Sequence, residues 1–385
     1  MSSFGRYSTM RTITLSLSLC LAAFVSLSQA SPAPAQETLK IGFGGALLGS
    51  LASYGLSNLY GIEVAIAKAN AAGGVLGRQV ELVKEDDSCD PALASSAATK
   101  LASQGIRLIL GHTCSGATHS ALSVYGGKAI VVSSSATDVY LTDSGDNPYF
   151  FRTTPRDDAQ SSLQVRLLKA KGFTRVALLH DKGDYGKSLA ELAEAAIKAD
   201  PASGITVALV EGVTSGQVSY DAVVAKVKDA GVDAIIWGGY YNDASKLAIN
   251  LRDRGVGAVI IGADGLYDER YVTMGGSAVE GSFATGQSDI SQSAAAQEAL
   301  AIHRKNHTEE TGTYFFYSMA AAEALFAAVE KAGTADDLDL IKTHLTSDTV
   351  DTVMGPVRFD AKGDVIGAGF KLYEVKDGKF VEATL

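Results

Sequence analysis

The chain has 385 residues, with 33 Lys and Arg against 43 Asp and Glu, which gives a formal net charge of −10 at neutral pH. This acidic balance excludes proteins that hold nucleic acid or an anionic membrane surface through a basic face. With 46% hydrophobic residues and 40 glycines, the composition is typical of a folded α/β protein, and the length favours two domains.

Residues 1–30 have the pattern of a secretion signal. Arg6 and Arg11 precede an almost wholly apolar or serine stretch, and small residues surround Ala30, where a signal peptidase would cut. A second possible cleavage site follows Ala35. We expect a cleaved signal peptide and export, and cleavage after residue 30 leaves a mature chain with a charge near −12 because the segment holds two Arg and no acid.

Short apolar runs rich in β-branched residues alternate with longer segments of helical period along most of the chain. The predicted strands are 39–43, 80–83, 108–110, 130–133, 176–180, 206–210, 234–237 and 259–261. The predicted helices between them are 61–72, 92–104, 159–171, 187–199, 220–230 and 243–254. This alternation predicts parallel sheets flanked by helices, with ligands beyond the carboxyl ends of the strands. Beyond residue 286 three helices are expected in succession, at 294–306, 314–332 and 337–346, before a β-like tail at 357–381.

Cys89 and Cys114 are the two cysteines that would remain after the signal, which contains Cys20, is removed. Each follows an apolar run and lies beside a loop of small polar residues. In a chain bound for an oxidising compartment, two remaining thiols favour a disulfide. Two buried reduced cysteines are the alternative.

Several fragments resemble catalytic or metal motifs but lack a required part. The segment 181–188 ends like a P-loop, yet Asp181 stands where the first glycine is needed, and 42–47 lacks the last glycine of a dinucleotide fingerprint. His303 and His307 have the spacing of zinc ligands, but their charged neighbours indicate a solvated face. A bridged Cys114 leaves no thiolate for His112 to activate. We therefore predict no metal, no cofactor and no catalytic residue.

Hydroxyls and tyrosines recur where the predicted strands end. Ser115 follows one strand and Ser133 to Thr137 follow another, while Tyr185, Tyr240 and Asp264 follow three more. Each serine alone is typical of a helix cap or turn, and Asp264 before Gly265 is by itself a turn signal. Because hydroxyls and free N–H groups at helix starts bind small carboxylates, their recurrence favours a ligand site.

At these residues the chain resembles the leucine/isoleucine/valine-binding proteins of branched-chain amino-acid ABC transporters, within the type I periplasmic binding protein superfamily. The resemblance covers essentially the whole mature chain. It is carried most specifically by the two cysteine segments, 86–91 and 111–115, and also by 54–55, 71–77, 180–182, 238–240 and 351–356.

The resemblance implies two Rossmann-like lobes with parallel sheets flanked by helices, joined by three hinge crossovers. We expect residues 39–155 plus 288–366 to form the first lobe and 156–287 plus 367–385 the second. It also implies the Cys89–Cys114 bridge, a periplasmic location, a monomeric protein, an ABC permease as partner, and an amino acid trapped between the lobes.

The resemblance further assigns roles to single residues. Ser115 and Thr137, with the backbone around Thr113 and Ser135, would hold the ligand carboxylate. Asp264, which stands where closely similar proteins have the longer Glu, would pair with the ammonium group. The expected ligand-binding residues are Tyr54, Thr113, Ser115, Ser135, Ala136, Thr137, Tyr185, Tyr240, Asp264 and Tyr314.

Two alternative functions remain open from the sequence. An exported hydrolase could use a strand-end serine with His112, His119 or His180 as its base. A receptor of the same fold could instead bind another amino acid, an amide or an aromatic acid for uptake or signalling, and for the last two Asp264 would have no cation to pair with.

Overall fold

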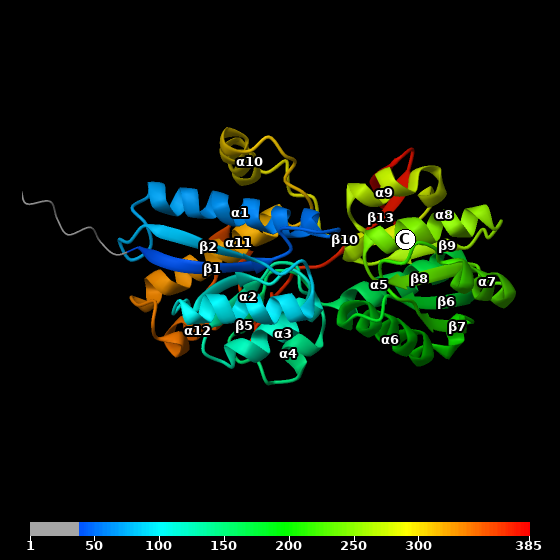
Figure 1. The fold of residues 1–385 in the computed structure, drawn as a ribbon, viewed down its shortest axis with the longest axis horizontal. Coiled ribbons are helices and arrows are strands. Elements are labelled where there is room, and N and C mark those ends of the chain that lie inside the picture. Colours follow the sequence, from blue (N-terminus) through cyan, green and yellow to red (C-terminus); the bar gives the residue numbers. More distant parts are fainter. Residues whose placement is uncertain (1–37) are drawn as a thin grey trace, which may run out of the picture. The chain divides into compact units, whose positions relative to one another are not determined.

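The computed structural model describes residues 38–385, so the predicted signal peptide lies outside the described residues. Two sheets organise this part of the chain (Figure 1). We call the five-stranded sheet with its helices the first lobe, and the seven-stranded sheet with its helices the second lobe. The domain boundaries expected from the sequence stay a prediction.

The first lobe contains a fully parallel sheet of order β2-β1-β3-β4-β5. Its strands are β1 (Leu39–Gly45), β2 (Val80–Asp86), β3 (Leu108–Gly111), β4 (Ile130–Ser133) and β5 (Phe150–Arg152). Its helices are α1 (Ala52–Ala71), α2 (Pro91–Ser103), α3 (Ser115–Tyr125), α4 (Tyr140–Asp143), α10 (Ala294–Asn306), α11 (Phe315–Ala332) and α12 (Leu338–Ser347). A short antiparallel hairpin, β11 (Val350–Thr352) with β12 (Gly355–Val357), follows them.

The second lobe contains a mixed sheet of order β14-β13-β10-β9-β8-β6-β7. Its strands are β6 (Arg175–His180), β7 (Thr206–Gly212), β8 (Ala234–Gly238), β9 (Val259–Gly262), β10 (Phe283–Gly286), β13 (Lys371–Lys376) and β14 (Lys379–Ala383). Its helices are α5 (Asp157–Lys171), α6 (Asp184–Ala199), α7 (Asp221–Ala230), α8 (Tyr241–Asp253) and α9 (Glu269–Gly275), with 3-10 turns η1 (Pro201–Ser203), η2 (Asp264–Leu266) and η3 (Gly276–Val279). The two strands from the C-terminal tail pair antiparallel to each other, and β13 pairs antiparallel with β10.

Both sheets share one strand order, although the sequence shows no internal repeat. Counting from the first strand of each lobe, the five parallel strands run 2-1-3-4-5 in both. In this doubly wound order, the crevice for a ligand lies at the carboxyl ends of the strands where the order reverses. Those points are between β1 and β3 in the first lobe and between β6 and β8 in the second. The structure thus confirms the predicted α/β class.

Three connections join the two sheets. The chain passes from β5 to α5 through residues 153–156, from β10 to α10 through 287–293, and from β12 to β13 through 358–370. The first connection follows Arg152, whose side chain is fully buried. Its Nε donates to Asp364 in the third connection at 2.6 Å, so these two crossings are fastened to each other.

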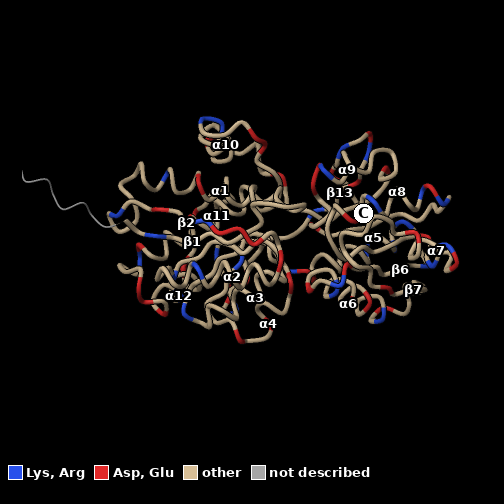
Figure 2. The backbone as a smooth tube through the Cα atoms, in the orientation of Figure 1, with Lys and Arg blue, Asp and Glu red and all other residues tan. Residues whose placement is uncertain are grey.

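Apolar strands flanked by helices form the cores. In the first lobe Ile41, Phe43 and Leu110 from the strands pack with Met319 and Leu325 from α11. In the second lobe the core includes fully buried side chains from β6 and β8 together with α8. At about 25 cal/mol per Å² of buried apolar surface, such burial is the main stabilising contribution to each lobe. Acidic and basic residues are interspersed along the backbone of both lobes (Figure 2).

The prediction that His303 lies on a solvated face is wrong. Its side chain is 2% exposed and packs between Tyr60, Phe315 and His307. The charged neighbours point outward, but α10 turns His303 toward α1 and α11. Nε2 lies 2.8 Å from the carbonyl oxygen of Glu309. Within residues 38–385, no cluster of His, Cys, Asp and Glu has an arrangement that would hold a metal ion.

None of the helices described between residues 38 and 385 combines the length and apolarity needed to cross a membrane.

Candidate ligand-binding site

A buried pocket lies where the carboxyl ends of strands from both lobes meet. It is lined by Tyr54, Thr113, Cys114, Ser115, Ser135, Tyr185, Tyr240, Asp264, Gly265 and Tyr314. Eight of the ten ligand-binding residues expected from the sequence are in this lining. Ala136 and Thr137 are not, although both are buried directly after Ser135.

Asp264 supplies the charge of the pocket. It lies in η2, directly after β9, and is 1% exposed. The Oδ1 atom accepts hydrogen bonds from Tyr185 at 2.9 Å and from Gln160 at 2.8 Å, and Oδ2 accepts one from Tyr314 at 3.0 Å. Burial raises the pKa of Asp264, although these hydrogen bonds act in the opposite direction. The carboxylate is held at a fixed position by neutral donors.

The turn after Asp264 requires a glycine. A Cβ atom on Gly265 would lie 2.9 Å from the Tyr185 hydroxyl and 2.9 Å from the carbonyl oxygen of Gly239. Its N–H donates to that same hydroxyl at 3.0 Å. The Asp-Gly turn therefore brings backbone and tyrosine close enough to fix the ring beside Asp264.

Four tyrosines form the walls of the pocket. Tyr54 comes from α1 and Tyr314 precedes α11, both in the first lobe, while Tyr185 and Tyr240 precede or begin helices of the second. The rings of Tyr185 and Tyr240 stack with centroids 5.1 Å apart, and Tyr54 lies 5.5 Å from Tyr314. Burial raises the pKa of all four phenols well above the usual value. They remain neutral donors at physiological pH.

The other end of the pocket is a polar end built by α3 and the loop after β4. Ser115 begins α3 directly after Cys114, whose backbone is extended as at a helix N-cap. The first N–H groups of this helix have no partner within it and carry a partial positive charge. The hydroxyls of Thr113 and Ser135 lie beside them in the lining. Such a helix start with hydroxyls is suited to a small carboxylate.

Asn58 organises this polar end and was missed from the sequence. Its Oδ1 accepts from Thr113 at 3.0 Å and from Ser135 at 3.3 Å, while its Nδ2 donates to Ser134 at 2.6 Å. It lies in α1, which begins nine residues before the predicted start. A polar, fully buried Asn next to Tyr54 on one helix was the available signal.

The disulfide between Cys89 and Cys114 is present, with the two Cα atoms 5.4 Å apart. It ties the loop after β2 to the start of α3. His112 strengthens the same junction, because its Nδ1 lies 2.6 Å from Oδ2 of Asp87 and its Nε2 lies 3.1 Å from the hydroxyl of Tyr125. The bridge predicted from the cysteine count is confirmed, and it supports the polar end of the pocket.

The geometry does not support the hydrolase alternative. His112 is engaged by Asp87 and Tyr125, His119 Nε2 lies 2.7 Å from Oδ2 of Asp138, and His180 Nδ1 accepts from the backbone of Lys182. None of these interactions joins a histidine to a strand-end serine. The three candidate bases therefore have structural partners.

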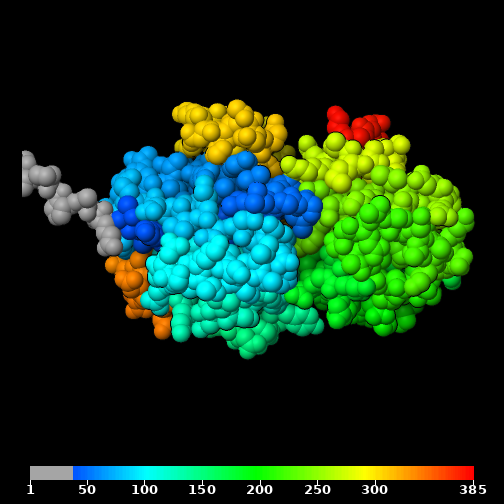
Figure 3. All heavy atoms as spheres, viewed as in Figure 1, coloured from blue at the N-terminus to red at the C-terminus, as the bar shows by residue number. Residues whose placement is uncertain are grey.

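Several contacts join the lobes around the pocket. Tyr54 donates to the carbonyl oxygen of Gly265 at 2.9 Å, and Tyr241 donates to that of Ser50 at 2.6 Å. On another side Ser188 of α6 donates to Asp138 at 2.8 Å. The contact of residues 50–54 with the second lobe is visible on one face of the molecule (Figure 3). These bonds hold the pocket shut.

The space between the lining side chains is small. Only about 10 Å³ of it can be reached by the centre of a water-sized sphere. This is about what one water molecule requires. A ligand of amino-acid size therefore needs the lobes to separate or the tyrosine rings to move before it can enter.

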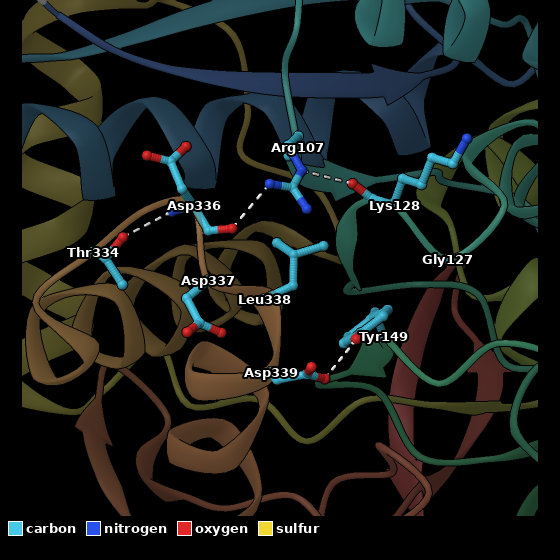
Figure 4. Close-up of a pocket in the computed structure, with 9 residues that line it drawn as sticks. All are labelled: Arg107, Gly127, Lys128, Tyr149, Thr334, Asp336, Asp337, Leu338 and Asp339. Atoms are coloured by element: carbon cyan, nitrogen blue, oxygen red, sulfur yellow. Dashed lines mark hydrogen bonds between the residues drawn. The ribbon is translucent and has the colours of Figure 1, made fainter.

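A second, larger hollow of about 530 Å³ lies at the opposite edge of the first sheet (Figure 4). Its polar groups bond mainly to one another: Arg107 donates to the carbonyl oxygens of Lys128 and Asp336, and Tyr149 donates to Asp339. These residues precede strands β3, β4 and β5, lie between α11 and α12, or belong to the first turn of α12. The hollow is open, and the hydrogen bonds around it hold the α11–α12 connection in place. We therefore do not regard it as the ligand site.

Comparisons with known proteins agree with this architecture. The profile of the family described as periplasmic binding protein matches residues 38–379. The Leu/Ile/Val-binding protein BraC3 of Rhizobium johnstonii is 34% identical over 381 residues, covering 97% of this chain and 100% of its own. A leucine-, isoleucine-, valine-, threonine- and alanine-binding protein of Pseudomonas aeruginosa is 30% identical, covering 95% of this chain and 96% of its own.

Among solved structures, the branched-chain amino acid transporter substrate binding protein LivJ of Streptococcus pneumoniae, in complex with isoleucine, superimposes with a TM-score of 0.77. It is 27% identical, and the match covers 90% of this chain and 100% of that one. The chain therefore belongs to the periplasmic binding protein family.

Proposed function

We propose that this member of the periplasmic binding protein family is an exported solute-binding protein that captures a branched-chain aliphatic amino acid between its two lobes and delivers it to an ABC permease. One observation carries the proposal: a buried carboxylate and a helix start with hydroxyls line the same pocket, from opposite lobes. A zwitterion removed from water needs both of its charges matched.

The roles we propose follow from that polarity. Asp264 pairs with the ammonium group, while Ser115 and the N–H groups that begin α3, with the backbone around Thr113 and Ser135, bind the carboxylate. The tyrosine rings enclose the aliphatic side chain. Since each end of the ligand then contacts a different lobe, binding favours the closed arrangement by its extra affinity for that state. No bond is made or broken.

The relatives give the proposal its ligand class. The names of the proteins from Rhizobium johnstonii and Pseudomonas aeruginosa state that they bind leucine, isoleucine and valine, and the Streptococcus pneumoniae structure holds isoleucine. Export to the periplasm, a cleaved signal and a monomeric mature form are parts of the same proposal. A receptor for amides or aromatic acids would leave the buried charge of Asp264 without a partner.

Isothermal titration calorimetry of the refolded, ligand-free mature protein tests the ligand class. The panel is leucine, isoleucine, valine, leucinamide, 4-methylpentanoate and benzoate. We expect saturable binding of at least one of the three amino acids. The two acids that lack an ammonium group and the amide that lacks a carboxylate should bind at least a hundredfold more weakly. Tight binding of benzoate or 4-methylpentanoate would contradict the proposal.

A further inference from the structure

A second buried carboxylate, Asp157, is joined to Asp264 through one side chain. The amide nitrogen Nε2 of Gln160 donates to Oδ1 of Asp157 at 2.9 Å and to Oδ1 of Asp264 at 2.8 Å. The amide oxygen of Gln160 accepts from the backbone N–H of Asp264 at 2.9 Å and from the hydroxyl of Thr285. All four hydrogen-bonding positions of Gln160 are used, so its orientation is fixed.

The two carboxyl groups are close together and shielded from water. Asp157 is 0% exposed and Asp264 is 1% exposed. Because both Oδ1 atoms bond to the same nitrogen, they lie no more than about 5.7 Å apart. At such a distance two carboxylates oppose each other's ionisation, and burial opposes the charged form of each.

The basic side chains nearby are engaged by other acids. Arg152 pairs with Asp364, Arg156 pairs with Asp143, Asp158 and Asp364, and His119 pairs with Asp138. The other titratable groups whose charge acts on the pair or that contact it are the phenols of Tyr54, Tyr185, Tyr240 and Tyr314. The charge of Arg152 also interacts with Asp157. Asp138 adds a further negative charge near Asp157.

Asp157 also has an oxygen that the fold does not use. Its Oδ2 is buried and has no hydrogen-bond partner of ordinary geometry among the described residues, although the Thr137 side chain lies close enough to act against the rise in pKa. An ionised oxygen in that position would be costly. Burial, and after it the negative charge of Asp264, raises the pKa of Asp157 well above its usual value. Geometry and electrostatics therefore both favour a protonated carboxyl group in this pair.

We propose that the Asp157–Asp264 pair shares one proton while no cation lies against Asp264, and that it releases this proton when the ligand's ammonium group binds. The O–H bond breaks heterolytically, the electron pair stays on the carboxyl oxygen, and the proton passes to solvent buffer. The proton release requires a ligand whose amine is cationic at neutral pH, as that of an α-amino acid is. This inference rests on the proposed function of the pocket.

The sign of the pH dependence follows from this exchange. The pair loses its shared proton at a lower pH in the ligand-bound protein than in the free protein. Between these two pH values the bound protein therefore holds fewer protons than the free protein. Affinity must therefore rise with pH across that window, by up to tenfold per pH unit. Since the amine itself remains cationic throughout, its own titration does not produce the effect.

Calorimetry of L-leucine in two buffers of different ionisation enthalpy at the same pH measures the protons exchanged. We expect the wild-type protein to release up to about one proton per leucine at pH values within this window. The Asp157→Asn variant should bind leucine with no proton release and with an affinity that no longer changes with pH. The matched control is Glu323→Gln, which alters a partly buried carboxyl group of raised pKa on α11 and should leave the proton release unchanged.

The outcomes are separable. Binding of leucine by wild type without proton exchange overturns this inference and leaves the proposed function intact, whereas absence of any amino-acid binding overturns both. Proton release that persists in Asp157→Asn refutes the assignment to this pair.

If Asp157→Asn does not fold, infrared difference spectra of the wild type decide. The inference requires a protonated carboxyl band that disappears when leucine is added, and an unchanged band in that region overturns it.

Discussion

Asp264 is the group whose charge distinguishes an amino acid from a simple carboxylic acid in this pocket, so Asp264→Asn removes one charge at nearly constant shape. In the proposed binding mode the ligand's ammonium group is buried against Asp264, whose side chain is 1% exposed. Leaving one partner of a buried ion pair without the other costs about 3–5 kcal/mol. At about 1.4 kcal/mol per factor of ten, affinity should fall at least a hundredfold.

Asp264→Asn should affect the stability of the ligand-free protein differently from its affinity for the ligand. The pKa of Asp264 is raised by burial, so its ionised form is disfavoured in the folded state and contributes no stability at neutral pH. The melting temperature of the ligand-free Asp264→Asn variant at neutral pH should therefore equal or exceed that of wild type. The matched control is Asp243→Asn in the same lobe, where an equally buried carboxylate bonds to Ser215 and to the backbone of Gly216.

Calorimetry of the preferred amino acid, with thermal unfolding of the same samples, distinguishes these effects. Asp243→Asn should lower the melting temperature but keep the affinity within threefold of wild type. If Asp264→Asn binds the same amino acid within tenfold of wild type, the placement of the ammonium site is wrong.

Three further perturbations address other parts of the account. Reduction of the Cys89–Cys114 bridge, or replacement of both cysteines by Ser, should destabilise the protein by up to about 3.5 kcal/mol by the loop-entropy model. It should also weaken leucine binding. A lower melting temperature with unchanged affinity would show that the bridge does not support the binding site. Burial raises the pKa of Asp181 to about 6, so its contribution to stability falls as pH rises from about 4 to 6. Asp181→Asn should therefore raise the melting temperature at pH 7.5 but not at pH 3.5. An equal shift of the melting temperature at both pH values would contradict this. Ser188→Ala removes a hydrogen bond from Ser188 to the Asp138 carboxylate between the lobes, worth roughly 1.5–3 kcal/mol. It should weaken leucine binding at least about fivefold, although Ser188 does not line the pocket. Wild-type affinity would show that this hydrogen bond does not stabilise the closed arrangement.

Much of the fold could be predicted because its strands are buried on both faces. Continuous apolar runs such as Ile130–Ser133 in β4 leave little ambiguity, and that strand was predicted at its observed bounds. By contrast α3 was missed. Its sequence is rich in Ser, Thr and Gly, and its helical conformation depends on the disulfide and the His112 contacts that fix its start. The three-residue strand β5 was missed because it ends in a buried Arg152.

Within the candidate site, the residues at strand ends were predictable and those behind them were not. Asp264, Tyr185 and Ser115 directly follow strands, and the sheet order brings such positions together. Gln160 lies on α5, where its function depends on contacts with residues more than a hundred positions away. The one available signal was the polar face of α5, where Asp157, Gln160, Ser161 and Gln164 recur at helical spacing and are all buried.

A crystal structure of the mature protein with its preferred branched-chain amino acid tests the central claim most directly. The account predicts the ammonium nitrogen within about 3 Å of an Asp264 carboxyl oxygen, as a charge-assisted hydrogen bond requires, and the ligand carboxylate at the start of α3 beside Ser115. The aliphatic side chain should lie among the rings of Tyr54, Tyr185 and Tyr240. A ligand bound in the reverse orientation, or bound outside the pocket between the two lobes, would contradict it.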